Sequence, residues 1–284
     1  MPKVSVLMPI HNTKEEYLRE AIESVLNQTY KDFEYIILNN SPSNKEMDRI
    51  VKSYEDKRIR YVKADYEMGI SKGRNKLMSL AKGEYYAILD HDDVCVPTRF
   101  EEEVKVLDKH PEIGVVGTLY ERFPKSKGIS KMPEKSEAIE EYLMEGCAVL
   151  HPSSMVRASV LKKNNIRYEE KFTPAEDYSL WCRLIGKTKF YNIQKVLMHY
   201  RWHGNNTSIL QDDKRLAAVK KIHAFLQKDY PKLWKKVHQT APYIVRGRLF
   251  DLIPILRMEI KGDTPPKWVN YLPFVKIKTK LKVK

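Results

Sequence analysis

Short apolar runs alternate with amphipathic segments through the first part of the chain. The runs are rich in Val, Ile, Leu and Tyr and end at polar residues, Pro or Gly, which is the pattern of buried strands. The predicted strands lie at 4–8, 35–38, 59–62, 85–89 and 113–116. Because helical patterns separate them, the sequence predicts an α/β fold with a mostly parallel, Rossmann-like sheet flanked by helices on both faces.

The helices between these strands carry start and stop signals. Thr13 lies three residues before Glu16, which is a capping-box pattern that predicts the start of a helix. Ser43 and Glu46 repeat this pattern ahead of the second helix. Gly83 follows a helical stretch, and a glycine in this position is a suitable C-terminal stop.

The regular alternation of strands and helices ends after residue 118. Residues 123–136 are rich in Lys, Pro, Ser and Gly, which indicates a loop or an excursion between two halves. The chain becomes strongly helical beyond residue 211. We therefore expect one half at 1–118, a second half of the same domain at 119–210, and a helical extension with a basic tail at 211–284.

The chain has a formal net charge of +14 at pH 7, which suggests an anionic partner such as nucleic acid, a phosphorylated ligand or an acidic membrane surface. Residues 267–284 contain six lysines and no acid, with Trp, Tyr and Phe between them. In 276–284 the lysines have a period of two, which favours an extended arm or edge strand. The tail is either an arm that binds anionic membrane or a solubilising terminus.

Cysteine usage and hydropathy both indicate a cytoplasmic protein. The three cysteines are widely spaced and have no CxxC pairing, so they are expected to be free thiols rather than a disulfide framework or a zinc site. The chain opens with a strand pattern instead of a signal peptide. It has no apolar run of the ~18 residues needed to span a bilayer.

Three carboxylates follow the apolar run at 85–89. Asp90, Asp92 and Asp93 lie where this strand would end, and ligands of open α/β sheets bind at that edge. Three adjacent acids repel one another unless a cation or a shared proton neutralises them, and a hard divalent metal carrying phosphate oxygens would do so. A solvated acidic cap of the next helix would give the same pattern, so the residues alone leave both interpretations open.

Five segments with chemical or positional character occur in a fixed order over roughly residues 3–210. They are VSVLMPIHN at 4–12, SVLNQTY at 24–30, GEYYAILDHDD at 83–93, AEDY at 175–178 and YRWH at 200–203. In this order they resemble the motifs of the family 2 glycosyltransferases, which have the GT-A fold. The resemblance implies an inverting, metal-dependent enzyme that moves a sugar, a hexosyl or N-acetylhexosaminyl group, from a nucleotide sugar to a hydroxyl.

The resemblance also implies roles for the acidic residues and one histidine. A divalent metal, Mn²⁺ or Mg²⁺, would be held by Asp92, Asp93 and His203, with Asp90 and Asp92 at the donor phosphates and ribose. The acid pair at 176–177 would serve the acceptor. In that pair Asp177 would be the catalytic base, and Glu176 would orient the acceptor or pair with a cation.

The donor pocket departs from the family pattern at one place. The nucleoside is implied to lie against Pro9, His11 and Asn12, and Arg74 either reaches the donor or is a solvated helix cation. The family usually has an Asp-Asp-Gly-Ser run after the second strand, whose Asp reads the base, but this chain has Asn39 and Asn40 there. Asn donates as well as accepts hydrogen bonds, so the base preference could differ, although a UDP-sugar remains the implied donor.

The implied acceptor is a glycan or a lipid-linked oligosaccharide in the synthesis of surface polysaccharide, capsule or lipopolysaccharide. With the basic tail, this suggests a bacterial enzyme that is peripheral at the inner face of the plasma membrane. A catalytically silent scaffold homologue is one alternative. A nucleic-acid-binding protein is another, disfavoured because much of the charge lies in the tail and no nucleic-acid-binding signature is present. The sequence leaves the oligomeric state open.

Overall fold

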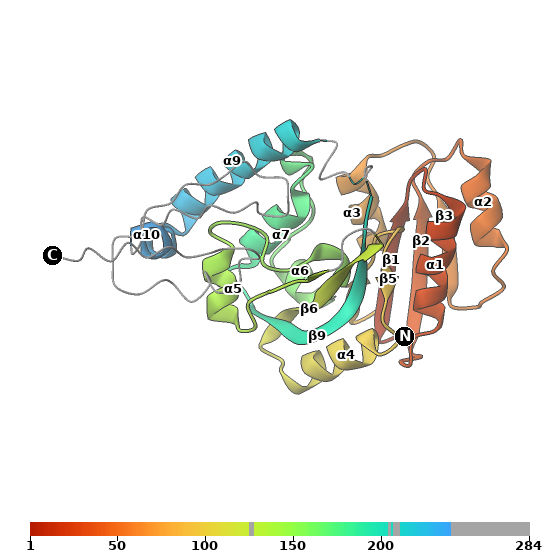
Figure 1. The fold of residues 1–284 in the computed structure, drawn as a ribbon, viewed down its shortest axis with the longest axis horizontal. Helices are drawn as coiled ribbons and strands as arrows, with labels where there is room; N and C mark the ends of the chain where they lie inside the picture. The colour runs from red at the N-terminus through yellow and green to blue at the C-terminus, as the bar shows by residue number, and fades with distance from the viewer. Residues whose placement is uncertain (125–127, 204–205, 207–210, 240–284) are drawn as a thin grey trace.

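The computed structural model describes residues 1–124, 128–203, 206 and 211–239. Nine strands form one sheet in the order β3-β2-β1-β4-β8-β6-β9-β5, and β7 pairs with β6. Helices cover both faces of this sheet (Figure 1), which confirms the predicted α/β fold. The strands are β1 (Val4–Ile10), β2 (Phe33–Asn39), β3 (Ile59–Lys63), β4 (Tyr85–Ile88), β5 (Val94–Cys95), β6 (Ile113–Pro124), β7 (Gly128–Ile129), β8 (Met155–Arg157) and β9 (Lys189–Trp202).

Helices alternate with the first four strands, and further helices follow in the second part of the chain. They are α1 (Glu15–Leu26), α2 (Lys45–Lys52), α3 (Ile70–Leu80), α4 (Arg99–Lys109), α5 (Ser136–Tyr142), α6 (Ala158–Lys163), α7 (Glu176–Leu184), α9 (Asp212–Asp229) and α10 (Pro231–Gln239). Two short 3₁₀ turns complete the elements, η1 (His151–Ser153) and η2 (Glu170–Phe172). The helical extension lies at the end of the molecule opposite α2 (Figure 1).

The sheet is parallel in its first part and mixed in its second. Strands β3, β2, β1 and β4 run parallel, with Val6 of β1 opposite Tyr35 on one side and Ala87 on the other. Strand β8 then runs antiparallel to both β4 and β6, while β6 and β9 are parallel to each other. The expected parallel arrangement therefore holds for the half of the sheet that carries the acidic loop.

Alternation along the strands divides the interior into two cores. In β1, Val4, Val6 and Met8 face the core formed with α1, α2 and α4, whereas Leu7 faces the core formed with helices that include α3, α6 and α7. A strand has a side-chain period of two, so each buried strand feeds both cores. This explains why the strand patterns read as continuous apolar runs rather than as alternation.

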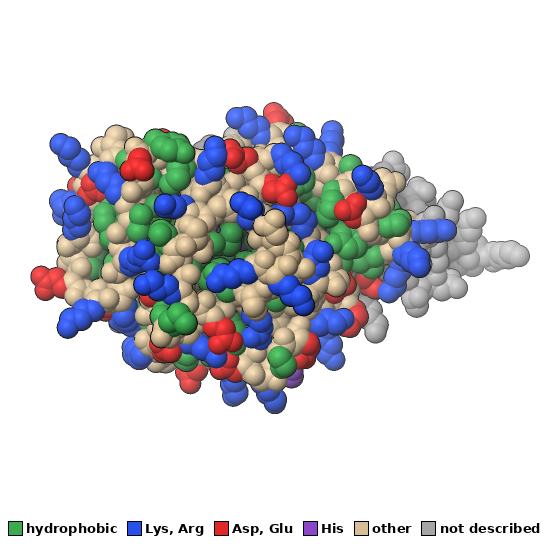
Figure 2. Space-filling view, turned by 180° about the vertical axis from the view of Figure 1, so that it is seen from behind, with side chains coloured by type: hydrophobic (Ala, Val, Ile, Leu, Met, Phe, Trp, Pro, Cys, Tyr) green, Lys and Arg blue, Asp and Glu red, His purple; other side chains and the backbone are tan. Residues whose placement is uncertain are grey.

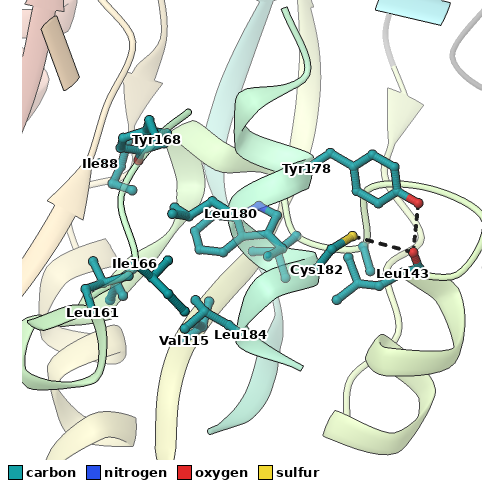
Figure 3. Packing of buried hydrophobic residues seen from close by; sticks show 14 of the residues in the cluster. Ile88, Val115, Leu143, Leu161, Ile166, Tyr168, Tyr178, Leu180, Cys182 and Leu184 are labelled. Carbon is teal, nitrogen blue, oxygen red and sulfur yellow. Dashed lines mark hydrogen bonds between the residues drawn. The ribbon is translucent and has the colours of Figure 1, made fainter. Parts of the chain in front are cut away.

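Helix α7 is fixed by contacts on two of its sides (Figure 3). Leu180 points toward Tyr168 and the core beside it, whereas Tyr178 and Cys182 point the other way, toward Leu143. The Tyr178 hydroxyl donates a hydrogen bond to the Leu143 carbonyl at 2.7 Å. Because α7 is held on both sides, its first turn has a fixed position relative to the sheet.

The helix starts differ from the predicted caps. Helix α1 begins after Lys14 with no side-chain cap, so the predicted Thr13 cap is wrong. Helix α2 is capped by Asn44 rather than by Ser43, because the Asn44 side chain accepts hydrogen bonds from two backbone amides of the first turn. A short amide side chain serves this role as well as a hydroxyl does.

The structural role of Gly83 differs from the helix stop that was predicted. Helix α3 ends at Leu80 with Ala81 as its C-cap, so Gly83 lies beyond it. The Gly83 amide donates to the Ser5 hydroxyl at 2.8 Å, and a Cβ at this position would lie 2.5 Å from the Ser5 amide nitrogen. The glycine therefore allows the chain to approach the start of β1 closely.

The second part of the chain departs from the predicted divisions in detail. Residue 118 lies inside β6, so the two predicted halves share one continuous strand. The helical extension breaks at Pro231, where α9 gives way to α10. The tail at 267–284 lies outside the described residues. No helix among the residues described is both long enough and apolar enough to cross a membrane.

Candidate functional site

The acidic loop connects β4 to β5 at the carboxyl edge of the parallel strands, as predicted. The three carboxylates have different environments. The side chains of Asp90 and Asp92 are 30% and 18% exposed, whereas Asp93 is completely buried. Only Asp90 and Asp92 are therefore accessible to a ligand at this edge of the sheet.

The buried side chain of Asp93 anchors the acidic loop. One carboxylate oxygen accepts a hydrogen bond from the Arg201 backbone amide at 2.8 Å, and the other has no protein partner. Burial, followed by the neighbouring charges of Asp92 and Asp90, raises the pKa of Asp93 well above its usual value. Asp93 thus ties the acidic loop to β9, which is distant in sequence.

The side chain of Arg201 holds the same loop from the side. Its Nε donates to the Asp92 carbonyl at 2.7 Å, and its guanidinium carbon lies 4.2 Å and 4.4 Å from the ring centroids of Tyr17 and Phe123. An ion pair with Glu20 of α1 completes this environment. The sequence prediction missed Arg201, although it lies in the Tyr-Arg-x-His segment that was used to select the histidine.

Asp92 and His203 form a pair that faces the accessible side of the loop. The His203 Nε2 lies 2.9 Å from a carboxylate oxygen of Asp92, and both side chains are about one-fifth exposed. Tyr17 stacks on the imidazole, and Asn206 accepts a hydrogen bond from the His203 amide. Burial opposes ionisation of Asp92, but the His203 contact and the nearby His91 outweigh it, so the pKa of Asp92 is lowered.

Arg74 connects the acidic loop to the acidic pair at 176–177. One guanidinium nitrogen lies 3.1 Å from Asp90, and the other lies 2.5 Å from Glu176. The Arg74 side chain is only 8% exposed and lies over the Tyr168 ring, 5.6 Å from its centroid. The alternative that Arg74 is a solvated helix cation is therefore wrong, and the two predicted acidic groups lie on either side of one guanidinium.

Glu176 and Asp177 lie in the first turn of α7 but have different surroundings. Glu176 is buried, and burial raises its pKa to about 7 although Arg74 opposes this. Asp177 is partly buried and accepts a hydrogen bond from the Tyr178 amide at 2.7 Å. Burial raises the pKa of Asp177, Arg74 lowers it, and Asp90 adds to the increase. Glu176 is thus occupied by Arg74, whereas the Asp177 side chain accepts its hydrogen bond from the backbone.

A neutral histidine supports the bridge from the interior. The Tyr168 hydroxyl lies 2.7 Å from Nε2 of His151, and the Asn75 side chain holds both the amide and the carbonyl of Tyr168. Burial, followed by the charges of Arg74 and Arg99, lowers the pKa of His151 well below its usual value. The uncharged imidazole therefore fixes the Tyr168 ring beneath Arg74.

Asn39 and Asn40 lie at the end of β2, and their side chains are used within the protein. The Asn39 amide donates to Asp48 and to the Tyr61 hydroxyl, and its oxygen accepts from the backbone at residue 41. Asn40 accepts from the Met68 amide and donates to the residue 69 carbonyl. The side chains of both asparagines therefore stabilise the residues around the expected nucleoside site.

Pro9 lies near the end of β1, and His11 and Asn12 follow this strand at the same edge. His11 is 46% exposed and lies 2.7 Å from Glu67, and Asn12 contacts Asn44 of the α2 cap at 2.9 Å. Asn12 has a φ of 43°, a left-handed conformation that asparagine tolerates better than most residues. The structure thus brings the predicted nucleoside residues together at the neighbouring ends of β1 and β2.

The residues at the edge fit a metal that takes most of its ligands from a substrate. The described residues contain no cluster of three or more His, Cys, Asp or Glu arranged to hold a metal. Asp92 and His203 offer one oxygen and one nitrogen side by side, and Mg²⁺ and similar ions are commonly bound by one or two protein ligands plus phosphate oxygens. Asp93 differs because its carboxylate is buried under the loop.

A parallel α/β sheet that carries an acidic loop and a second acidic pair at its carboxyl edge is the arrangement of a GT-A glycosyltransferase. The family model described as glycosyl transferase family 2 matches residues 5–165. The chain belongs to this family. It is 36% identical over 241 residues to an uncharacterized glycosyltransferase of Methanocaldococcus jannaschii, covering 82% of this chain and 80% of the relative. The putative glycosyltransferase EpsE of Bacillus subtilis is 32% identical over 208 residues, with 70% and 73% covered.

Solved structures with low sequence identity share the fold. TarS of S. aureus in complex with UDP-GlcNAc aligns with a TM-score of 0.68 at 17% identity, covering 83% of this chain and 71% of TarS. The mannosyltransferase PcManGT of Pyrobaculum calidifontis, in complex with GDP-Man and Mn²⁺, aligns with a TM-score of 0.61 at 14% identity, covering 84% and 69%. These likenesses confirm the GT-A fold predicted from the sequence.

The Arg74 bridge makes a testable contribution to stability. Replacing Arg74 with Met leaves the Glu176 carboxylate buried without its cation, so we expect the free energy of unfolding to fall by about 3–5 kcal/mol at pH 8. The loss should be smaller at pH 6, because Glu176, whose pKa is raised to about 7 even with Arg74 present, then takes up a proton. Urea unfolding at the two pH values measures both effects.

A double-mutant cycle controls for the loss of packing. Glu176→Gln removes the charge and keeps the shape, so the double variant Arg74→Met/Glu176→Gln should be less destabilised than the sum of the single variants by about 0.5–3 kcal/mol. Strictly additive losses would show that the two side chains are not coupled.

Proposed function

We propose that this glycosyltransferase moves a sugar from a nucleotide sugar to an acceptor hydroxyl with inversion of configuration. The observation that carries the proposal is the Arg74 guanidinium, which contacts Asp90 of the acidic loop and Glu176 of the acidic pair. A leaving group held at the loop and a base held at the start of α7 are thereby a short distance apart. Inverting transfer requires these two functions and no covalent nucleophile.

In the proposed reaction Asp177 is the general base. The acceptor oxygen attacks the anomeric carbon, the bond from that carbon to the diphosphate oxygen breaks, and the hydroxyl proton passes to the Asp177 carboxylate. The raised pKa of Asp177 brings it closer to the operating pH than an ordinary aspartate, which favours proton transfer. Glu176 is held by Arg74, and we assign it to orienting α7 and the acceptor side.

We propose that Asp92 and His203 hold a divalent metal, Mn²⁺ or Mg²⁺. When bound, such an ion neutralises the negative charge of a diphosphate leaving group. Asp90 faces the same edge and is assigned to the donor. Asp93 was also expected to be a ligand, and its buried carboxylate instead supports a role in fixing the loop to β9.

We propose UDP-sugars as the donors, with Pro9, His11 and Asn12 against the nucleoside. TarS binds UDP-GlcNAc and PcManGT binds GDP-Man, so a nucleotide sugar is supported for the family fold while the base differs between these proteins. Asn39 and Asn40 hold Tyr61 and the backbone at residues 68–69. Through these contacts the two asparagines would determine which nucleotide base the pocket prefers.

The proposed acceptor is a glycan or lipid-linked oligosaccharide at the inner face of the plasma membrane, in the synthesis of surface polysaccharide. Lys and Arg side chains are spread over one whole face of the molecule and interspersed with Asp and Glu (Figure 2). This face has no single basic stripe of the kind that tracks a nucleic-acid backbone. The concentrated positive charge lies in the sequence of 267–284, which would approach anionic lipid.

Replacing the base should abolish transfer and leave donor binding intact. We expect Asp177→Asn to lower kcat by about 10²–10⁴-fold, which is the typical contribution of a general base. The assay is release of the nucleoside diphosphate in the presence of candidate acceptors. Because the base acts when ionised and its pKa is raised, wild-type kcat/KM should fall as the pH decreases through a value above the ordinary ~3.9 of aspartate.

The matched control is Asp32→Asn, an exposed aspartate before β2 at the opposite edge of the sheet. It should keep full turnover. Normal turnover in Asp177→Asn would refute the base assignment. No turnover by the wild-type protein with any nucleotide sugar, despite donor binding, would favour the catalytically silent scaffold.

The metal and nucleotide assignments can be tested by thermal stabilisation. A ligand that binds the folded state raises the apparent stability according to its saturation. We expect UDP with Mn²⁺ to raise the Tm of the wild-type protein more than GDP with Mn²⁺. His203→Ala should shift the Mn²⁺ titration to concentrations at least about tenfold higher.

His199→Ala is the control, since this histidine lies on β9, the strand that ends just before His203, is 39% exposed and faces Glu121 instead of the acidic loop. It should titrate like the wild type. An unchanged Mn²⁺ titration in His203→Ala would exclude His203 as a ligand, and a larger Tm increase with GDP would overturn the choice of uridine.

The role of the tail is tested by deleting residues 267–284. With six lysines that each contribute about 1 kcal/mol near an anionic surface, the full chain should co-sediment with phosphatidylglycerol vesicles and not with phosphatidylcholine vesicles. The truncated chain should remain in the supernatant and still act on a short soluble acceptor. Equal co-sedimentation of the two proteins would exclude the tail as the membrane contact.

A further inference from the structure

Arg99 is an arginine with no exposed surface, buried beneath the acidic loop. It is the first residue of α4, and its ion-pair partner Glu103 is also completely buried. Both side chains lie on the side of the sheet where Phe100, Val104 and Leu107 of the same helix form part of the core. Its position, away from the accessible edge, excludes Arg99 as a ligand of the donor or the acceptor.

The guanidinium of Arg99 uses all five of its N–H donors. One nitrogen donates to the carbonyls of Ile88 and Ser154 at 3.0 Å and 3.1 Å. The other donates to the Pro152 carbonyl at 2.8 Å and to the Cys95 sulfur at 3.2 Å, and Nε donates to Glu103 at 3.2 Å. A guanidinium has five donors in a rigid planar fork, so these acceptors fix its orientation completely.

Two of these acceptors belong to the residues that flank the acidic loop, which we call its stems. Ile88 is the last residue of β4 and Cys95 is the last residue of β5, so the segment that contains all three carboxylates leaves and returns at one guanidinium. Two further acceptors, at residues 152 and 154, belong to or follow η1 in the second half of the chain. The fifth acceptor is Glu103 of α4 itself. Arg99 therefore sets the distance between the stems and also their position relative to that half.

Polar side chains of α1 and of the residues just after it hold the Cys95 stem independently of Arg99. The Ser24 hydroxyl accepts from the Cys95 amide at 3.1 Å. The Gln28 side chain donates to the Val96 carbonyl at 2.9 Å and accepts from the Phe100 amide at 3.0 Å. Ser24 and Gln28 belong to the SVLNQTY segment, whose role the proposed chemistry leaves unexplained. The contacts give that segment a supporting function beneath the loop.

Stability alone is a poor explanation for this arrangement. Replacing a buried ion pair with apolar residues of similar volume is often neutral or stabilising, so such a pair is weak evidence for a stabilising role. The guanidinium of Arg99 instead fixes the relative positions of β4, β5 and the segment around η1. It does so through the acceptor atoms of Ile88, Cys95 and residues 152 and 154. A displacement of about 1 Å at a reacting group can lower a rate about 10²-fold, so this geometry matters where chemistry occurs.

We propose that Arg99, assisted by Gln28, is a positioning residue for the acidic loop. By clamping the two stems at Ile88 and Cys95, it holds Asp90 against Arg74 and Asp92 against His203. Its effect on turnover rests on the proposed function, whereas its effect on the loop itself does not. The two effects can therefore be measured separately.

The test is Arg99→Lys in the full chain. Lysine keeps the charge but has three donors on one nitrogen, so it cannot reach all five acceptors of the fork. Hydrogen exchange followed by mass spectrometry should show amides in 89–94 exchanging about tenfold faster, with α2 unchanged. At saturating donor and metal, kcat should fall by about 10²-fold.

Leu107→Ala is the matched control. Leu107 is fully buried two turns further along α4, so this variant should lower Tm through lost packing while exchange in 89–94 and kcat stay at wild-type values. Gln28→Met is a milder second variant, which should speed exchange near residues 94–96 even if Arg99→Lys does not fold. The exchange measurement needs no substrate, so failure of the proposed function leaves it intact.

Three outcomes would overturn the proposal. One is wild-type exchange in 89–94 in Arg99→Lys together with wild-type exchange in 94–96 in Gln28→Met. Another is a loss of kcat in Leu107→Ala that matches the loss in Arg99→Lys at equal Tm, since this would reduce Arg99 to a stability residue. The last is an unfolded Arg99→Lys protein together with unchanged exchange in Gln28→Met.

Discussion

The interaction on which the site depends is the contact of one guanidinium with two carboxylates. Arg74 lies between Asp90 and Glu176, which come from opposite halves of the chain and would repel each other across a partly dry interface. Arginine suits this position because it stays charged when buried and its two terminal nitrogens can face different acids. The contacts of α3 with Tyr168 and Thr173 align the two halves so that this bridge can form.

A second arginine, Arg99 of α4, holds the same loop at a different point from Arg74 of α3. Arg74 contacts the carboxylate of Asp90, while Arg99 holds the carbonyl of Ile88 two residues earlier. Arg201 fixes the far side of the loop through the backbone of Asp92. Three arginines from α3, α4 and β9 thus determine the position of a short acidic segment. A reactive loop can be held accurately in this way because its supports are helices and strands.

The sequence predicted the fold where local patterns are sufficient. Five of the six strands that begin within the first 118 residues were located, because each is a short apolar run between helical patterns. The two-residue strand β5 was missed. The antiparallel insertion of β8 and the pairing of β6 with β9 could not be predicted in this way, since they depend on contacts between distant segments. The cap of α2 was wrong for a smaller reason: Ser and Asn compete for such positions on nearly equal terms. The cap of α1 was wrong because this helix starts after Lys14 without any side-chain cap.

The acids of the site were found in the sequence because a cluster of like charges after a strand is costly and therefore conspicuous. Arg74 was found as a candidate, but its pairing with Glu176 and the role of Arg99 were not, for the opposite reason. Arg99 reads as an ordinary charged residue in the first turn of a helix, and Arg74 lies 102 positions from Glu176. Burial turns such residues from surface charges into structural links, and burial is a property of the whole fold. A charged residue at a core-facing position of a helix, as Arg99 is in α4, is the one local sign that such a link exists.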